Sequence, residues 1–104
     1  MIGKYEVITL CGSMKFGKHF IEQQKRLTLE GKIVLSVDFF DNNNEVINKE
    51  QKIMLDDMHK RKIDMSDGIF VINVGGYIGT STRSEIDYAL HTGKVVDYLE
   101  KTNI

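Results

Sequence analysis

The sequence predicts an α/β fold built around a parallel β-sheet. Four short segments are apolar and rich in β-branched residues, and three segments of helical periodicity lie between them. The first and third apolar segments, at Val7–Cys11 and Ile69–Ile72, are nearly continuous in apolar residues, which is typical of strands covered on both faces. This alternation favours parallel strands joined by right-handed crossovers, with helices on both faces of the sheet.

The bounds of the expected elements follow from where each pattern begins and ends. The expected strands are Tyr5–Cys11, Lys32–Phe39, Gly68–Val74 and Lys94–Leu99. Apolar residues at helical spacing indicate three helices. The first contains Phe16, Phe20, Ile21 and Leu27, the second Leu55, Met58 and Ile63, and the third Ile86, Ala89 and Leu90. Gly31 and Gly93 end the first and third helices, and the second is expected to begin near Val46.

Together these elements predict one domain over residues 1–104. The expected architecture is a small flavodoxin-like or Rossmann-like three-layer sandwich, with four to five parallel strands in the order 2-1-3-4. A chain of this size has little surface to spare for an enclosed pocket. We therefore expect a homodimer or a larger homo-oligomer, in which a second subunit completes the site.

The composition favours a cytoplasmic protein that does not bind a nucleic acid polymer. The 14 Lys and Arg residues balance 15 Asp and Glu residues, for a net charge of −1, so binding to a nucleic acid polymer is not expected. Cys11 is the only cysteine, which excludes an internal disulfide and suits a reducing compartment. No apolar segment resembles a secretory signal or approaches the ~20 residues of a membrane helix.

The candidate ligand site lies where the order of the strands reverses, at the carboxyl ends of the first and third strands. The loops at that point, residues 12–15 and 75–82, are rich in glycine and hydroxyl residues, which allow close approach to the backbone at a helix N-terminus. The expected substrate contacts are Gly12, Ser13, Met14, Gly76, Tyr77, Gly79, Ser81 and Thr82. Tight turns explain the glycines equally well, and an N-cap explains Ser13 equally well.

Glu85 has two interpretations. It follows the second loop at the start of the third helix, where a carboxylate facing the pocket would serve as a nucleophile or base. However, Thr82-Arg83-Ser84-Glu85 also matches a capping box, in which the glutamate binds the backbone of the N-cap residue. The spacing alone favours the capping box.

No cofactor or metal ion is expected. The glycine fingerprint of dinucleotide-binding folds and the Walker phosphate loop are both absent, and no second His or Cys stands at metal-ligand spacing.

His59 shares a helical line with Leu55 and Ile63 and so borders the buried face. Cys11 is expected to be a buried, unreactive thiol, and Asp67-Gly68 reads as a turn at the amino end of the third strand, away from the pocket.

Motifs distributed along most of the chain resemble the nucleoside 2-deoxyribosyltransferase-like family. They are Ile8-Thr9-Leu10-Cys11-Gly12-Ser13, then Ile63-Asp64-Met65-Ser66-Asp67-Gly68-Ile69-Phe70-Val71-Ile72, then Gly79-Thr80-Ser81-Thr82-Arg83-Ser84-Glu85-Ile86-Asp87-Tyr88-Ala89, and Gly93-Lys94. The most specific part is the loop of small residues followed by Glu85-Ile86, Tyr88-Ala89 and the Gly-Lys-Val sequence.

The resemblance implies a compact flavodoxin-like fold, oligomeric assembly and cleavage of the N-glycosidic bond of a 2′-deoxynucleoside or its 5′-monophosphate. It implies that Glu85 is the nucleophile, which attacks the anomeric carbon and forms a covalent deoxyribosyl-enzyme before transfer or hydrolysis. The family's assisting aspartate falls at or near His59 in this sequence, flanked by Asp56 and Asp64. The histidine is a candidate acid, because its unperturbed pKa of ~6.5 suits protonation of a leaving base.

Two other functions remain open at this stage. One is a non-catalytic nucleotide-binding or sensing module in which the same loops bind and Glu85 caps a helix. The other is a phosphoribohydrolase similar to the cytokinin-activating family, whose Gly-Gly-x-Gly-Thr-x-x-Glu pattern is related to residues 75–85. The upstream glycine-rich motif of that family is missing, so this function ranks lower.

Overall fold

The computed structural model describes residues 1–37 and 47–101. At its centre is a four-stranded sheet in which each neighbouring pair of strands is parallel. The strands lie in the order β2-β1-β3-β4, with bounds Val7–Gly12 for β1, Ile33–Leu35 for β2, Gly68–Ile72 for β3 and Val95–Tyr98 for β4. The predicted α/β class and the 2-1-3-4 order are therefore confirmed.

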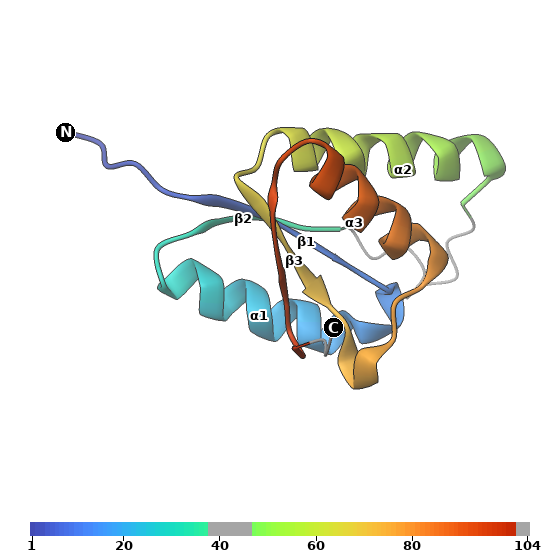
Figure 1. The fold of residues 1–104 in the computed structure, drawn as a ribbon, viewed down its shortest axis with the longest axis horizontal. Coiled ribbons are helices and arrows are strands. Elements are labelled where there is room, and N and C mark those ends of the chain that lie inside the picture. The colour runs from blue at the N-terminus through green and yellow to red at the C-terminus, as the bar shows by residue number, and fades with distance from the viewer. Residues whose placement is uncertain (38–46, 102–104) are drawn as a thin grey trace.

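Helices cover both faces of this sheet (Figure 1). They are α1 (Gly17–Leu29), α2 (Lys49–Asp64) and α3 (Thr80–His91), together with the short 3-10 turns η1 (Met14–Phe16) and η3 (Val74–Gly76). Helix α1 lies on one face, and α2 and α3 lie next to each other on the other face (Figure 1). The predicted three-layer sandwich is confirmed. No helix in the described ranges has the length and apolar character needed to cross a membrane.

Strand β1 shows why the strand patterns are continuously apolar. Successive side chains of a strand point to opposite faces, and both faces of β1 are covered. Leu10 packs with Phe20 of α1 in one buried cluster, whereas Cys11 packs with Ile63 of α2 and Ile86 of α3 in the other. This alternation brings the thiol of Cys11 to the layer formed by α2 and α3.

The ends of β1 and β3 differ from the predicted ones by at most two residues: β1 begins at Val7 and continues to Gly12, and β3 ends at Ile72. At the start of β1, the backbone N–H of Val7 donates to the Asp67 carboxylate at 2.8 Å, which places Asp67 at the amino end of β3, as predicted. After β3, Asn73 exchanges two hydrogen bonds with the backbone of Glu100, at 2.9 and 2.8 Å. The chain then turns at Gly75, which has a φ of 64°.

Helix α2 begins at Lys49, directly after its N-cap residue Asn48, and a capping box that was not predicted from the sequence stabilises this start. The Asn48 side chain accepts from the Gln51 N–H at 2.7 Å, and the Gln51 side chain accepts from the Asn48 N–H at 3.0 Å. The helix start expected near Val46 and the strand end expected at Phe39 both lie outside the described residues.

Two glycines allow neighbouring strands to approach closely. A Cβ atom at Gly68 would lie 2.7 Å from the carbonyl oxygen of Val95 in β4. A Cβ atom at Gly12 would lie 2.9 Å from the carbonyl oxygen of Ile72 and 3.3 Å from the ring of Phe20. Packing within the fold therefore accounts for Gly12, whether or not a ligand also approaches it.

Candidate functional site

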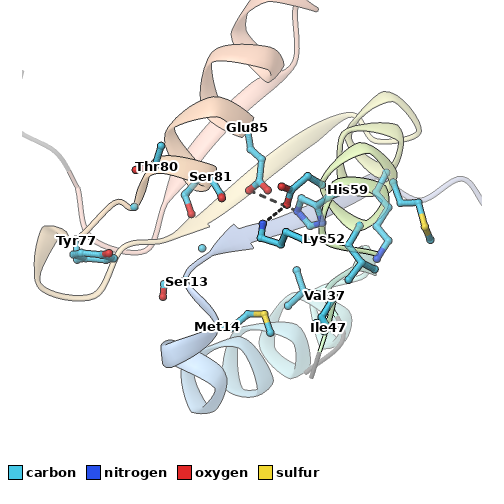
Figure 2. Close-up of a pocket in the computed structure, with 17 residues that line it drawn as sticks. Ser13, Met14, Val37, Ile47, Lys52, His59, Tyr77, Thr80, Ser81 and Glu85 are labelled. Atoms are coloured by element: carbon cyan, nitrogen blue, oxygen red, sulfur yellow. Dashed lines mark hydrogen bonds and ion pairs between the residues drawn. The ribbon is translucent and has the colours of Figure 1, made fainter. Parts of the chain in front are cut away.

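A cavity of about 410 Å³ opens at the carboxyl ends of β1 and β3 (Figure 2). It lies where the reversal of strand order predicts a ligand site, and its volume falls within the usual range for small-molecule pockets. Three segments form most of its wall: the turn after β1, one face of α2, and the loop before α3 together with the first two turns of that helix. Val37 and Ile47 add to the apolar part of the lining.

Glu85 extends from α3 into this cavity (Figure 2). Helix α3 begins at Thr80 after the N-cap residue Gly79, so Glu85 is the sixth helical residue and lies in the second turn. The predicted capping box is therefore wrong: Thr82 is a buried residue within the helix, and it is not the N-cap. Because Glu85 is a full turn beyond the helix start, its carboxylate is available to the cavity.

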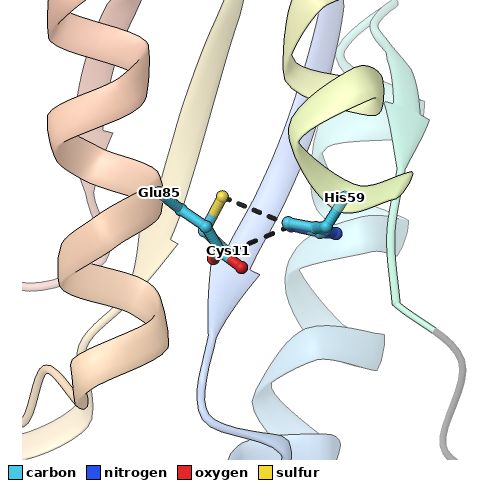
Figure 3. A group of neighbouring side chains, drawn as sticks. All are labelled: Cys11, His59 and Glu85. Atoms are coloured by element: carbon cyan, nitrogen blue, oxygen red, sulfur yellow. Dashed lines mark hydrogen bonds and ion pairs between the residues drawn. The ribbon is translucent and has the colours of Figure 1, made fainter. Parts of the chain in front are cut away.

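The side chains of Cys11, His59 and Glu85 converge at the inner wall of the cavity (Figure 3). They come from β1, α2 and α3. The Nε2 atom of His59 lies 3.8 Å from Oε1 of Glu85 and 3.5 Å from Sγ of Cys11. The thiol is fully buried, His59 is 6% exposed, and the Glu85 side chain is 13% exposed.

Burial shifts the pKa values of these groups in the directions that favour their neutral forms. It raises the pKa of Glu85 from 4.5 to about 7, an effect that a hydrogen bond from the Cys11 thiol partly opposes. Burial and the nearby charge of Lys62 lower the pKa of His59 from 6.5 to about 4. The pKa of Cys11 is raised by burial and then by the charge of Glu85. Between about pH 4 and pH 7, the His59–Glu85 pair therefore holds one proton, which resides on Glu85.

The turn after β1 satisfies both interpretations of Ser13. Its hydroxyl accepts a hydrogen bond from the backbone N–H of Lys15 at 3.3 Å and so caps η1. The same residue lines the cavity together with Gly12 and Met14. Capping and access to a ligand are thus compatible at this position.

Tyr77 lines the cavity at a distance from His59 and Glu85 (Figure 2). Its ring is held by aromatic and cationic neighbours. The Nζ atom of Lys15 lies 3.5 Å from the centroid of its ring, and the ring of Phe16 packs edge-to-face against it at a centroid distance of 6.0 Å. These contacts hold the ring near Gly79 and Ser81, the N-cap residue and the second residue of α3, both of which line the cavity.

Most of the expected contact residues lie in the cavity wall, but Gly76 does not. The wall includes Gly12, Ser13, Met14, Tyr77, Gly79, Ser81 and Thr82, as well as the candidate catalytic residues His59 and Glu85. Gly76 instead has a φ of 82°, which glycine adopts readily, so the conformation of the turn explains this residue.

One face of α2 contributes residues that the sequence analysis did not assign to the site. They are Lys52, Leu55, Asp56, Met58 and Lys62, and Thr80 is a further addition from α3. For four of the α2 residues the signal was helical spacing relative to His59, at seven residues for Lys52, four for Leu55 and three for Asp56 and Lys62. The structure also separates the two aspartates that flank His59, because Asp56 lines the cavity whereas Asp64 accepts a hydrogen bond from the Tyr88 hydroxyl at 2.6 Å.

Comparison with known proteins adds no assignment to this geometry. No protein-family model matches the chain, and no curated protein matches its sequence.

Proposed function

We propose that this protein cleaves or transfers at the N-glycosidic bond of a 2′-deoxynucleoside or its 5′-monophosphate, with Glu85 as the nucleophile. The observation that carries the proposal is the position of the Glu85 carboxylate, which reaches from α3 into a ligand-sized cavity and contacts a buried histidine. The sequence motifs that resemble the nucleoside 2-deoxyribosyltransferase-like family point to the same residue.

The polar and apolar residues of the lining suit the two parts of such a substrate. Ser13, Ser81 and Thr82 bring hydroxyl groups to the lining, which suit the sugar or a 5′-phosphate. Gly79 brings no capping side chain to the start of α3, which leaves the first backbone N–H groups of that helix to bind an anion. Met14 and Leu55 supply an apolar surface suited to the face of a nucleobase.

The proposed reaction begins with transfer of the shared proton. Glu85 gives its proton to Nε2 of His59, and the resulting carboxylate attacks the anomeric carbon of the sugar. The bond between that carbon and the base nitrogen breaks, and the imidazolium of His59 donates the proton to the departing base. The deoxyribosyl ester on Glu85 is then resolved by a second base or by water, so that the configuration is retained.

The energy of the first step is compatible with catalysis. The pKa values of Glu85 and His59 are about 7 and about 4, so moving the proton from the acid to the imidazole is uphill by about 4 kcal/mol. This is small beside the roughly 8–23 kcal/mol by which enzymes lower barriers. The separation of 3.8 Å has to shorten when substrate binds, as is common for catalytic contacts seen without ligand.

A substrate panel tests the proposal. The protein is incubated with 2′-deoxynucleosides and their 5′-monophosphates, with and without a free acceptor base, and products are separated by chromatography. We expect release of free base, which is lost in Glu85→Gln and retained in Glu22→Gln, a matched change on the exposed face of α1. Binding of a substrate without turnover would overturn the proposal and favour a nucleotide-binding module.

A further inference from the structure

We propose that Cys11, His59 and Glu85 form a binding site for a divalent transition-metal ion of the zinc type, with a fourth coordination position open to the cavity. The proposal concerns metal binding itself. It goes beyond the proposed glycosidic activity and does not depend on it. It rests on the convergence of three donor atoms of different chemical kinds from β1, α2 and α3 (Figure 3).

The distances between the donor atoms are close to those of a tetrahedral zinc site. With Zn–S near 2.3 Å and Zn–N and Zn–O near 2.0–2.1 Å, tetrahedral angles give an S···N edge of about 3.6 Å and an N···O edge of about 3.4 Å. The corresponding distances here are 3.5 Å for Cys11 Sγ to His59 Nε2 and 3.8 Å for His59 Nε2 to Glu85 Oε1. All three donor atoms lie within 4.8 Å of one another, so an ion between them would need only a small approach of the donors.

The arrangement of contacts around His59 distinguishes this site from a catalytic triad. In a triad, the nucleophile and the orienting carboxylate bind different nitrogens of the imidazole. Here Cys11 and Glu85 both approach the same nitrogen, Nε2. The three donors therefore surround one point, which is the geometry needed for an ion and not for a proton relay to the thiol.

The charges of the site match those of a divalent ion. Binding displaces the proton of the Cys11 thiol and any proton on Glu85 into solvent, and the two resulting anions neutralise the ion next to a neutral imidazole. The site is thus neutral overall in surroundings where a net charge would be costly. A thiolate and an imidazole favour zinc-type ions over magnesium or calcium.

The cavity supplies both a path of entry and the open coordination position. His59 and Glu85 line the cavity, whereas Cys11 lies behind them with no exposed surface. An ion entering from the cavity would meet the carboxylate and imidazole first and the thiol at the base. Three protein ligands and one exchangeable position is the arrangement of accessible zinc sites rather than closed structural ones.

Cobalt(II) absorption provides a direct test. Reduced, chelator-treated protein without an affinity tag is titrated with Co²⁺, which substitutes for Zn²⁺ and reports thiolate coordination by a charge-transfer band. Because Cys11 is the only cysteine, any such band identifies this thiolate. We expect a band that saturates at one equivalent, disappears when Zn²⁺ is added, and is absent in Cys11→Ser.

Variants of the other two ligands keep the test decisive if Cys11→Ser does not fold. His59→Gln and Glu85→Gln should each weaken Co²⁺ binding at least tenfold, with circular dichroism confirming the fold. His91→Gln, which removes an exposed histidine of α3, should bind like the unchanged protein. Absence of the band at saturating Co²⁺, or unaltered affinity in both ligand variants, would overturn the proposal. No substrate is present, so failure of the glycosidic proposal leaves this result unaffected.

Discussion

Replacing Glu85 with glutamine is expected to stabilise the fold at alkaline pH and to have little effect at acidic pH. The pKa of Glu85 rises from 4.5 to about 7 in the folded chain, mainly because of burial. Below pH 4.5 the carboxyl group is protonated in both the folded and unfolded chains. Between that pH and about 7 the unfolded chain loses the proton first, so stability falls as the pH rises. Above about pH 7, the folded chain carries the full destabilisation from the buried Glu85 carboxylate.

The size of this effect follows from the pKa difference. A difference of about 2.5 between the folded and unfolded states corresponds to about 3 kcal/mol, and the low exposure of the side chain, at 13%, requires little discount for solvent screening. This is a large share of the roughly 5–15 kcal/mol by which small domains are stable. Glutamine has nearly the same shape without the charge, so the variant should recover most of that free energy above pH 7.

Urea unfolding of both proteins across this pH range measures the difference. With slopes of about 1–3 kcal/mol per molar urea, the midpoint of Glu85→Gln should exceed that of the unchanged protein by roughly 1–3 M at about pH 8 and match it near pH 4. A chelator keeps both proteins metal-free. The pKa of His59 is lowered to about 4 and so gives the opposite slope, which largely cancels in the comparison because both proteins retain this residue.

Two outcomes would refute this reasoning. If Glu85→Gln were less stable at neutral and alkaline pH, the carboxylate would be part of a stabilising ion pair with a charged imidazole. If the difference were independent of pH, the carboxylate would be hydrated and not buried. Glu22→Gln on the exposed face of α1 is the control, and its stability difference should not change across the same window.

Three further predictions test other parts of the account. His59→Gln should lower kcat by roughly 10²–10⁴-fold, as expected for loss of a general acid. The kcat/KM of the unchanged protein should fall above pH 7, where the His59–Glu85 pair has lost its proton. If steady-state assays show that His59→Gln is unimpaired, the acid role is excluded. Gly68→Ala should destabilise the fold by about 1–3 kcal/mol, because its Cβ would meet the Val95 carbonyl oxygen at 2.7 Å, and an unchanged urea midpoint would contradict the close approach of β3 and β4. If both proposals hold, Zn²⁺ should inhibit base release by occupying the Glu85 carboxylate, and a chelator should restore it; full activity with the metal site saturated would contradict the use of Glu85 as both metal ligand and nucleophile.

The class of fold and the order of the strands could be predicted from the sequence because they depend on patterns that extend over many residues. Continuous apolar segments such as Ile69–Ile72 require cover on both faces, and that requirement determines the layers. Individual positions were less predictable. Phe20 and Leu27 are buried as expected, but Ile21 is 65% exposed, because helical periodicity alone does not determine the width of the buried face.

The site was predictable where it depends on topology and unpredictable where it depends on contacts between elements. The carboxyl ends of β1 and β3 meet at one edge of any sheet with this order, so the position of the loops could be foreseen. The start of α3 at Thr80 could not, since Thr82 and Glu85 have the spacing of a capping box. The convergence of Cys11 and His59, which are separated by 48 residues, depends on how α2 packs against β1 and leaves no trace in local spacing.

The most direct measurement of the central claim is the mass of the protein after rapid acid quenching during turnover. The account predicts a population heavier by one deoxyribosyl group, or by its 5′-phosphate form, attached to the peptide that contains Glu85. The adduct should disappear when an acceptor base is added and should be absent in Glu85→Gln. Base release without any adduct, or an adduct on a different residue, would contradict the assignment of Glu85 as the nucleophile.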